Sequence, residues 1–262
     1  MPTNEMIARK DGPIAWMIFN NPLRHNAVSL AMWTAAEAIL DDFARDDGVR
    51  VIVLTGAGDK AFVSGADISK FADERAAADA VGRYNLQVER TLDRLQGMTK
   101  PTLAMIRGYC IGGGVGIALC CDLRIAAEDA RFAIPAAKLG LGYGHEGLGR
   151  LVDIVGPAFA KELFFTARQF DAKAAATMGL VNRVLPTGEL EAFVRDYAGT
   201  IAENAPLTIT AVKQIVNELV KGESERDIQL CERLVADCFA SRDYTEGRTA
   251  FMEKRKPVFV GH

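Results

Sequence analysis

The sequence predicts a mixed α/β (α+β) protein, in which strands alternate with helices in the first part of the chain and helices alone complete it. Apolar runs typical of buried strands end in glycine at 49–56 and at 101–108. An apolar stripe with helical spacing follows Ser29. Beyond residue 147 the remaining segments have helical patterns and few strand signals. Together these observations place β/α units first and a helical region last.

Each early element has a local signal. "MIARKDGPIAWMIFN" (6–20) consists of two short apolar runs around Asp11-Gly12, which predicts a β-hairpin. Ser29 is the expected N-cap of the next helix, because its hydroxyl can accept from a backbone N–H of the first turn. The apolar stripe of that helix is Met32, Ala36, Ile39, Leu40 and Phe43.

The later elements follow in the same manner. Residues 71–97 have helical character, and the strand at 101–108 leads to a helix-like "GVGIALCC" (114–121). "DLRIAAEDARFAI" (122–134) predicts two more strands with a turn near Glu128-Asp129. Helical segments are then expected at 162–179, 188–204, 206–222 and 224–256.

Composition limits the classes of partner. The 262 residues carry a formal net charge of -3, so nothing draws the chain as a whole to nucleic acid or to an anionic membrane. No apolar run approaches about 20 residues, and the N-terminus lacks the apolar core of a signal peptide. The five cysteines include no C-x-x-C pair and have mostly apolar neighbours, which favours reduced thiols and a cytoplasmic location. Cys231 and Cys238 share one helical face, which favours core packing.

Residues 142–147, "GYGHEG", match G-x-G-x-x-G literally. A dinucleotide-binding turn needs a strand directly before the glycines and an acidic residue about 20 positions later. The preceding "PAAKLGL" is a poor strand, and the two dozen residues that follow look helical. The motif therefore does not predict nucleotide binding, and no Walker A loop occurs elsewhere.

Two other glycine stretches follow strands directly, at 54–71 and 107–126. A strand that enters Gly112-Gly113-Gly114 and then a helix leaves bare backbone N–H groups at the helix start, where a ligand oxygen can approach closely. Close packing of the helix on a strand is the alternative explanation of the glycines.

Several ordered motifs now identify a resemblance. The chain resembles the enoyl-CoA hydratase/isomerase (crotonase) superfamily from about residue 14 to its end. The similarity is carried by "NNPLRHNAVS", "GAGDKAFVSGADI", "KPTLAMIRGYCIGGG", "CDLRIAAEDARFAIP", "GLGRLVDIVGP", "FTARQFDAKAAATMGLVNRV" and "FMEKRKPVF". The resemblance implies a crotonase-type spiral of repeated ββα units over 1–200. It also implies a C-terminal helical region, 201–262, that builds a homotrimer or a hexamer made of two trimers.

The same resemblance implies an acyl-CoA thioester as substrate, with coenzyme A as part of that substrate and no permanently bound cofactor. The backbone N–H groups of Ala66 and Gly113 match the family's oxyanion hole, where they would hold the thioester carbonyl and stabilise an enolate. Such donors are worth roughly 3–4 kcal/mol each in related sites.

Coenzyme A is expected along "NNPLRHNA" and "GADI". The resemblance makes Arg24 a candidate phosphate partner, with Asp67 and Ile68 in the same site. Capping of the turn or helix at "DISKF" is the favoured role of Asp67. Lys254 is a candidate contact for the nucleotide end of the ligand, in the same chain or on a neighbouring subunit.

The chain departs from the family at the two catalytic carboxylates. Hydratases of this family use one glutamate to activate water and another to deliver the proton. The matching positions here are Gly116 and Ala136. Two-glutamate hydration is therefore not supported, and neither is the single-glutamate isomerase pattern at position 136. The missing side chains leave room for a bulky or branched acyl group.

The "GYGHEG" loop is a candidate source of replacement chemistry. Other branches of the family place an aspartate that faces the ligand at the positions of Tyr143 and Gly144. Here Tyr143 can donate a hydrogen bond, the His145 imidazole can accept or give a proton, and Glu146 can act as a base if it is desolvated. The alternative is that His145 and Glu146 point to solvent, since a glutamate suits the start of a helix without any chemistry.

The sequence thus favours an enolate-forming hydratase/isomerase-family enzyme, a lyase or an isomerase. It leaves two alternatives open. One is an acyl-CoA binding protein without catalysis, and the other is a hydrolase, decarboxylase or carbon–carbon lyase of the same fold. No spacing of His, Cys, Asp and Glu suggests a metal site.

Overall fold

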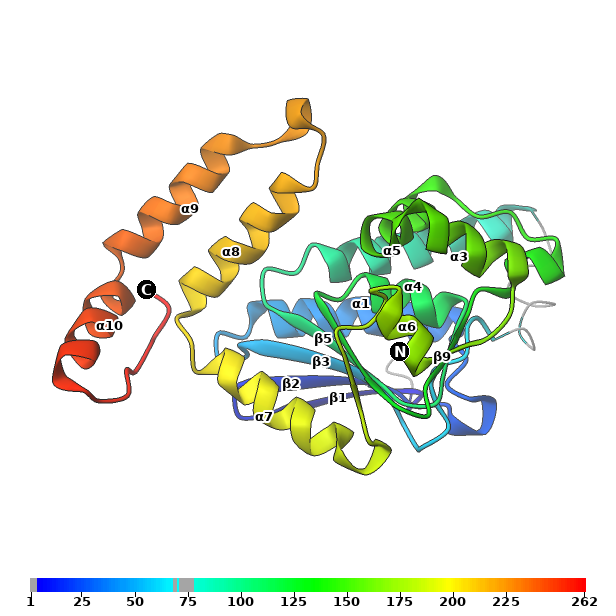
Figure 1. Ribbon diagram of the computed structural model, residues 1–262, viewed down its shortest axis with the longest axis horizontal. Helices are drawn as coiled ribbons and strands as arrows, with labels where there is room; N and C mark the ends of the chain where they lie inside the picture. Colours follow the sequence, from blue (N-terminus) through cyan, green and yellow to red (C-terminus); the bar gives the residue numbers. More distant parts are fainter. Residues whose placement is uncertain (1–3, 68–69, 71–77) are drawn as a thin grey trace.

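The computed structural model describes residues 4–67, 70 and 78–262, and it contains two sheets (Figure 1). One sheet has the strand order β1-β2-β3-β5-β7-β10, and the other has the order β4-β6-β8-β9. The strands are β1 (Met6–Asp11), β2 (Ile14–Phe19), β3 (Val51–Gly56), β4 (Ala61–Val63), β5 (Thr102–Ile106), β6 (Tyr109–Ile111), β7 (Leu123–Ala127), β8 (Arg131–Ala133), β9 (Phe170–Asp171) and β10 (Arg183–Leu185). The α-helices in these parts of the chain are α1 (Leu30–Arg45), α3 (Ala78–Gln96), α4 (Gly113–Leu119), α5 (His145–Thr166), α6 (Ala172–Thr177), α7 (Leu190–Ala202), α8 (Pro206–Leu219), α9 (Ile228–Ala240) and α10 (Arg242–Glu253).

The six-stranded sheet is covered on both faces. Side chains along β3 alternate, so that Val51 and Val53 join the apolar cluster under α7, whereas Ile52 and Leu54 join the larger cluster with α1 and α3. A parallel strand buried on both faces needs an unbroken apolar run, which explains why this segment reads as one in the sequence. Figure 1 shows α7 on the opposite side of these strands from α1.

The predicted N-terminal elements are confirmed. β1 and β2 form an antiparallel hairpin with Asp11 opposite Ile14. The hydroxyl of Ser29 accepts a hydrogen bond from the Met32 N–H and caps α1. Trp33 joins the expected stripe in the core, while Ile39 is only partly buried.

The ββα repeat expected from the resemblance is also present. β3 is followed by β4, β5 by β6, and β7 by β8, and in each case the first strand lies in the large sheet and the second in the small one. The chain therefore winds as a spiral that adds one strand to each sheet per turn. The sequence did not indicate β4 and β6, because each has only three residues and shows no clear alternation.

The helical part contains short strands as well. Residues 162–179 do not form one helix: α5 ends at Thr166, Ala167 takes a left-handed conformation, and β9 precedes α6. α5 itself is broken at Gly156-Pro157, where Gly156 has φ 73°. A proline cannot donate the helical hydrogen bond, so the two halves of α5 take different directions.

Helices α8, α9 and α10 project from the sheets as an arm (Figure 1). The Lys213 ammonium on α8 lies 2.8 Å from the Asp122 carboxylate, which joins the arm to the core. The Arg50 guanidinium donates to the carbonyl oxygens of Ala202 and Phe259 and ties the end of α7 to the C-terminal tail. Within the parts of the chain that are described, no helix is long and apolar enough to cross a membrane.

The cysteines are free thiols in two environments. Cys110, Cys120 and Cys121 are buried in the core. Cys231 and Cys238 are only half-buried on α9, so the expected core packing of this pair is not found in the single chain. A helix in the arm has no second layer over its outer face, and its apolar side chains stay partly exposed for that reason.

Candidate active site

The "SGADI" segment presents one bare backbone N–H group. Ala66 forms a parallel bridge with Val28, in which the Val28 N–H donates to the Gly65 carbonyl and the Asp67 N–H donates to the Val28 carbonyl. In such a bridge the middle residue turns its own N–H to the opposite side. The Ala66 N–H therefore points away from Val28. Gly65 has φ 111°, a conformation that favours glycine and that redirects the chain here.

The second bare N–H belongs to Gly113, the first residue of α4. N–H groups in the first turn have no partner within the helix. The Gly112 N–H is already used by the Ala133 carbonyl, which fixes the start of α4 against β8. A Cβ placed on Gly113 would lie 4.0 Å from the Ala66 nitrogen, and one on Gly65 would lie 3.9 Å from the Gly113 nitrogen. The structure thus brings the two predicted donors side by side with no side chain between them.

The next glycine has a different task. A Cβ on Gly114 would overlap the carbonyl group of Val63 in β4. This contact of α4 with β4 holds the two bare N–H groups together. Both explanations of the triple glycine therefore apply, because Gly114 serves packing while Gly113 stays open.

The structure also describes Gly116 and Ala136, the two positions at which the sequence analysis expects carboxylates to be missing. Gly116 lies one turn after Gly113 on α4, and a Cβ there would meet no atom within 4 Å. Ala136 belongs to the 3-10 helix η3 (Pro135–Leu139) and is only 4% exposed. Neither position carries an acid or a base, and the position of Gly116 opens to empty space.

The polar side chains of the "GYGHEG" loop differ in burial: Tyr143 is half-buried, whereas His145 and Glu146 are exposed. The Tyr143 ring packs edge-on against Phe164, with 4.9 Å between ring centroids, and burial raises the pKa of its hydroxyl. His145 begins α5 with its side chain 93% exposed, and Glu146 in the same turn is 52% exposed. The desolvation that would make Glu146 a strong base is therefore missing in the single chain. η3 rather than a strand precedes the loop, so this G-x-G-x-x-G is not a dinucleotide turn.

Comparison with known proteins identifies the family of the chain. The sequence model described as enoyl-CoA hydratase/isomerase matches residues 9–262. The short-chain-enoyl-CoA hydratase of Clostridium acetobutylicum is 34% identical, over 98% of this chain and 97% of that protein. The crotonyl-CoA hydratase of Syntrophomonas wolfei is 36% identical, over 99% of both chains. The crystal structure of an enoyl-CoA hydratase from Bacillus anthracis superposes with a TM-score of 0.94 at 30% identity, over 99% of this chain and 100% of that one.

The chain belongs to the enoyl-CoA hydratase/isomerase family. The expected crotonase-type fold is thereby confirmed, and the spiral of ββα units is its core.

Two residues expected at the coenzyme A site of this family enzyme lie together. The Arg24 guanidinium is 3.7 Å from the Asp67 carboxylate. Asp67 is 3% exposed, whereas the Arg24 side chain is 55% exposed, so the arginine is held at one end and can still reach a ligand. Ile68 lies outside the described residues. Lys254 directly follows α10, a helix of the arm that lies away from the sheets (Figure 1). Its role stays a prediction.

One buried residue that holds the Arg24 loop in place was not predicted from the sequence. Asn26 is fully buried and takes φ 56° beside His25, which takes φ 52°. Its side chain accepts from the Asn21 N–H and donates to the carbonyl oxygens of Ala57 and Ala61. It therefore binds the Arg24 loop to the start of β4. The only indication in the sequence that Asn26 is buried is the apolar pair Ala27-Val28 that directly follows it.

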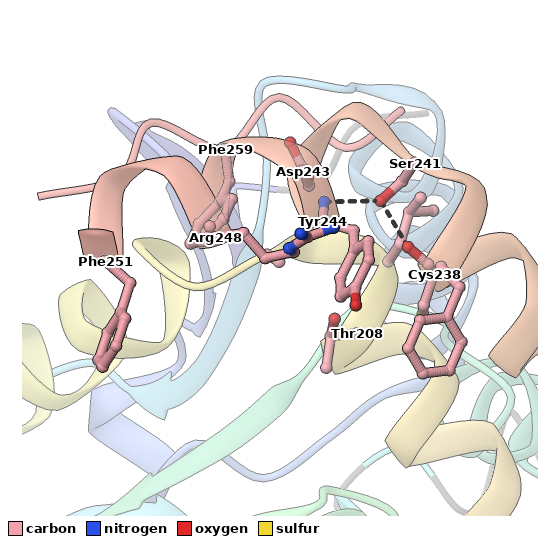
Figure 2. Close-up of a pocket in the computed structure, with 12 residues that line it drawn as sticks. Thr208, Cys238, Ser241, Asp243, Tyr244, Arg248, Phe251 and Phe259 are labelled. Atoms are coloured by element: carbon pink, nitrogen blue, oxygen red, sulfur yellow. Dashed lines mark hydrogen bonds between the residues drawn. The ribbon is translucent and has the colours of Figure 1, made fainter. Parts of the chain in front are cut away.

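A cavity of about 560 Å³ lies in the arm rather than at the paired N–H groups. Figure 2 shows it between α10 and the end of α9, with Tyr244 and Thr208 pointing toward one another. The Ser241 hydroxyl accepts from the Tyr244 N–H and donates to the Cys238 carbonyl, which fixes the corner between the two helices. Among the described residues, no group of three or more His, Cys, Asp or Glu side chains could hold a metal ion.

The two glycines allow a matched test of the site. We expect Gly113→Ala to fold normally, because its Cβ meets only ordinary contacts, and to lose at least about 100-fold in turnover, because the methyl group crowds the two N–H donors. Gly114→Ala should instead lower the free energy of unfolding by on the order of 3 kcal/mol, because its Cβ overlaps a backbone carbonyl. Urea unfolding and steady-state kinetics on both variants check this. Equal loss of stability in the two variants would contradict it.

Proposed function

We propose that this protein is an acyl-CoA enzyme that stabilises a thioester enolate between the backbone N–H groups of Ala66 and Gly113. The single observation that carries the proposal is the meeting of these two bare donors without a side chain between them. Two N–H groups directed at one oxygen favour the anionic form of a carbonyl, in which the charge sits on that oxygen.

The proposed step is proton transfer at the carbon next to the thioester carbonyl. A base removes a proton from this carbon, and the electron pair moves to the carbonyl oxygen, where the two N–H groups hold it. Return of a proton to the same or a more distant carbon gives exchange or isomerisation, and addition of water to an enoyl thioester passes through the same enolate. No electrons are gained or lost overall.

The base is not one of the two family glutamates, since Gly116 and Ala136 occupy those positions. The "GYGHEG" loop is the proposed source of the acid and base, through Tyr143, His145 or Glu146. The support is positional: the loop follows η3, which carries Ala136, and the half-buried Tyr143 hydroxyl, whose pKa is raised by burial, is a hydrogen-bond donor at neutral pH.

One observation favours a second candidate. The exposure of His145 and Glu146 leaves the single chain without a desolvated base in this loop. A non-catalytic acyl-CoA binding protein needs no base. A thioester hydrolase, a decarboxylase or a carbon–carbon lyase needs only the oxyanion hole and an ordered water or a leaving group.

Deuterium exchange tests the proposal. We expect deuterium from D₂O to enter the carbon next to the carbonyl of at least one thioester in a panel of acyl- and enoyl-CoA compounds, followed by proton NMR. Glu146→Gln should slow the exchange by about 10²–10⁴-fold if this carboxylate is the base. Asp153→Asn, an exposed change on the same helix, is the control and should leave the rate unchanged. Tight binding of thioesters without any exchange would support the second candidate instead.

The empty position on α4 predicts a gain of function. The double variant Gly116→Glu/Ala136→Glu should hydrate crotonyl-CoA at least about tenfold faster than the parent, because it restores both carboxylates beside an existing oxyanion hole. The loss of the enoyl absorbance measures this rate. The double glutamine variant, of equal size but without charge, is the control and should show no gain. Equal hydration rates in the two variants would contradict the prediction.

We also propose that the arm assembles the protein into a trimer, or into two stacked trimers. The support is the set of large apolar side chains that the arm exposes, namely Val212, Val216, Leu219, Val220, Ile228, Val235, Phe239, Phe251 and Met252. Monomeric proteins rarely leave so many apolar groups in one region. Light scattering should give three or six times the mass of one chain, and the mass of a single chain would refute assembly.

A further inference from the structure

A buried arginine side chain lies at the C-terminal end of α4. Arg124 on β7 is 6% exposed, and its guanidinium donates to the carbonyl oxygens of Cys121 at 2.8 Å, Leu180 at 2.8 Å and Ala118 at 3.4 Å. Two of these carbonyls belong to the last turn of α4 and the residues directly after it. The guanidinium therefore caps the C-terminal end of the helix whose first residue is Gly113.

The backbone of Arg124 is held as firmly as its side chain. Its N–H donates to the Asn182 side-chain oxygen, and its carbonyl accepts from the Asn182 N–H. The neighbouring Asp122 carboxylate is occupied by three other donors, which are the Thr102 N–H, the Thr102 hydroxyl and the Lys213 ammonium. The three side-chain hydrogen bonds of Arg124 thus end on neutral carbonyl groups, and no carboxylate among the described residues forms a salt bridge with its guanidinium.

The position of this charge matters for the thioester site. α4 has seven residues, which corresponds to a length of about 10 Å. A cation at its C-terminal end neutralises the negative end of the helix dipole and also attracts negative charge at the other end. Both effects favour an oxyanion beside Gly113, and the protein interior between the two ends screens them weakly.

We propose that Arg124 is a positioning residue that supplies fixed positive charge behind the oxyanion hole and directs α4 toward the thioester carbonyl. This inference rests on the proposed thioester site. It assigns to a core arginine, remote from any reacting atom, a part in stabilising the enolate. The guanidinium lies beyond the last turn of α4 and the oxyanion before its first residue, so the two charges are about 15 Å apart; at an effective dielectric constant of about 20 this corresponds to roughly sixfold in rate.

The test separates charge from packing. Arg124→Gln keeps polar contacts but removes the charge, and Arg124→Lys keeps the charge. We expect the exchange rate in D₂O to fall roughly sixfold in Arg124→Gln and to stay within about twofold of the parent in Arg124→Lys. Asn182→Ala disturbs the same corner without changing any charge and should behave like the lysine variant. Equal losses in all three variants would show a packing role and overturn the proposal.

A spectroscopic measurement reports on the hole directly. Hexanoyl-CoA labelled with ¹³C at the carbonyl cannot be hydrated, and its infrared carbonyl stretch falls in frequency when N–H groups polarise it. We expect a lowered frequency in the parent and in Arg124→Lys, and a smaller shift in Arg124→Gln. No lowering in the parent would refute the oxyanion hole itself. Lowering of equal size in parent and Arg124→Gln would refute only the role of Arg124.

The lysine variant also covers the case in which Arg124→Gln does not fold. A buried lysine loses its proton below its ordinary pKa, so the carbonyl frequency in Arg124→Lys should rise as the pH is raised, while the parent stays constant. The titratable groups around this position are Asp122, Cys120 and Cys121. Burial raises the pKa of both thiols, that of Cys120 to about 12, so they stay neutral over the range measured. A frequency independent of pH in both proteins would contradict the proposal.

Discussion

The contact between α4 and β4 is the constraint on which the rest of the site depends. Gly114 lets the helix rest on the carbonyl group of Val63, with no side chain between the two backbones. A larger residue at Gly114 would overlap this carbonyl group and strain the contact between α4 and β4. β4, β6 and β8 lie side by side in the small sheet, which brings the two glycine segments to one place. The proposed oxyanion hole thus depends on the packing of two backbones.

Much of this arrangement could be read from the sequence, because its signals are local. The hairpin, the Ser29 cap and the buried strand at Val51–Gly56 each depend on residues that are close in the chain. The triple glycine before α4 already indicated bare N–H groups at a helix start, whereas the pairing of Gly113 with Ala66 was accessible only through the ordered family motifs, since a backbone N–H group carries no side-chain signal. β4 and β6 were missed because three residues are too few for a periodic pattern.

Other features depend on contacts between distant segments, which composition and spacing do not encode. The three hydrogen bonds of Asn26 join residues up to 35 positions apart, and those of Arg124 reach Leu180, 56 positions away. In the sequence both residues look like ordinary polar side chains. The exposure of His145 and Glu146 is likewise set by where α5 begins, and helix starts are the least certain boundaries in sequence analysis.

A hydrogen-bond donor that belongs to the main chain survives most substitutions of its own residue. Every amino acid except proline carries an N–H group, so most substitutions at Ala66 leave that donor chemically intact, although its surroundings change. The side chains around it have no such protection. Gly116 and Ala136 carry no carboxylate, whereas the backbone N–H groups of Ala66 and Gly113 lie close together. A lineage with this architecture can lose one reaction and acquire another without first rebuilding the place where the substrate sits. What such a fold retains is the place where the substrate binds, and not one particular reaction.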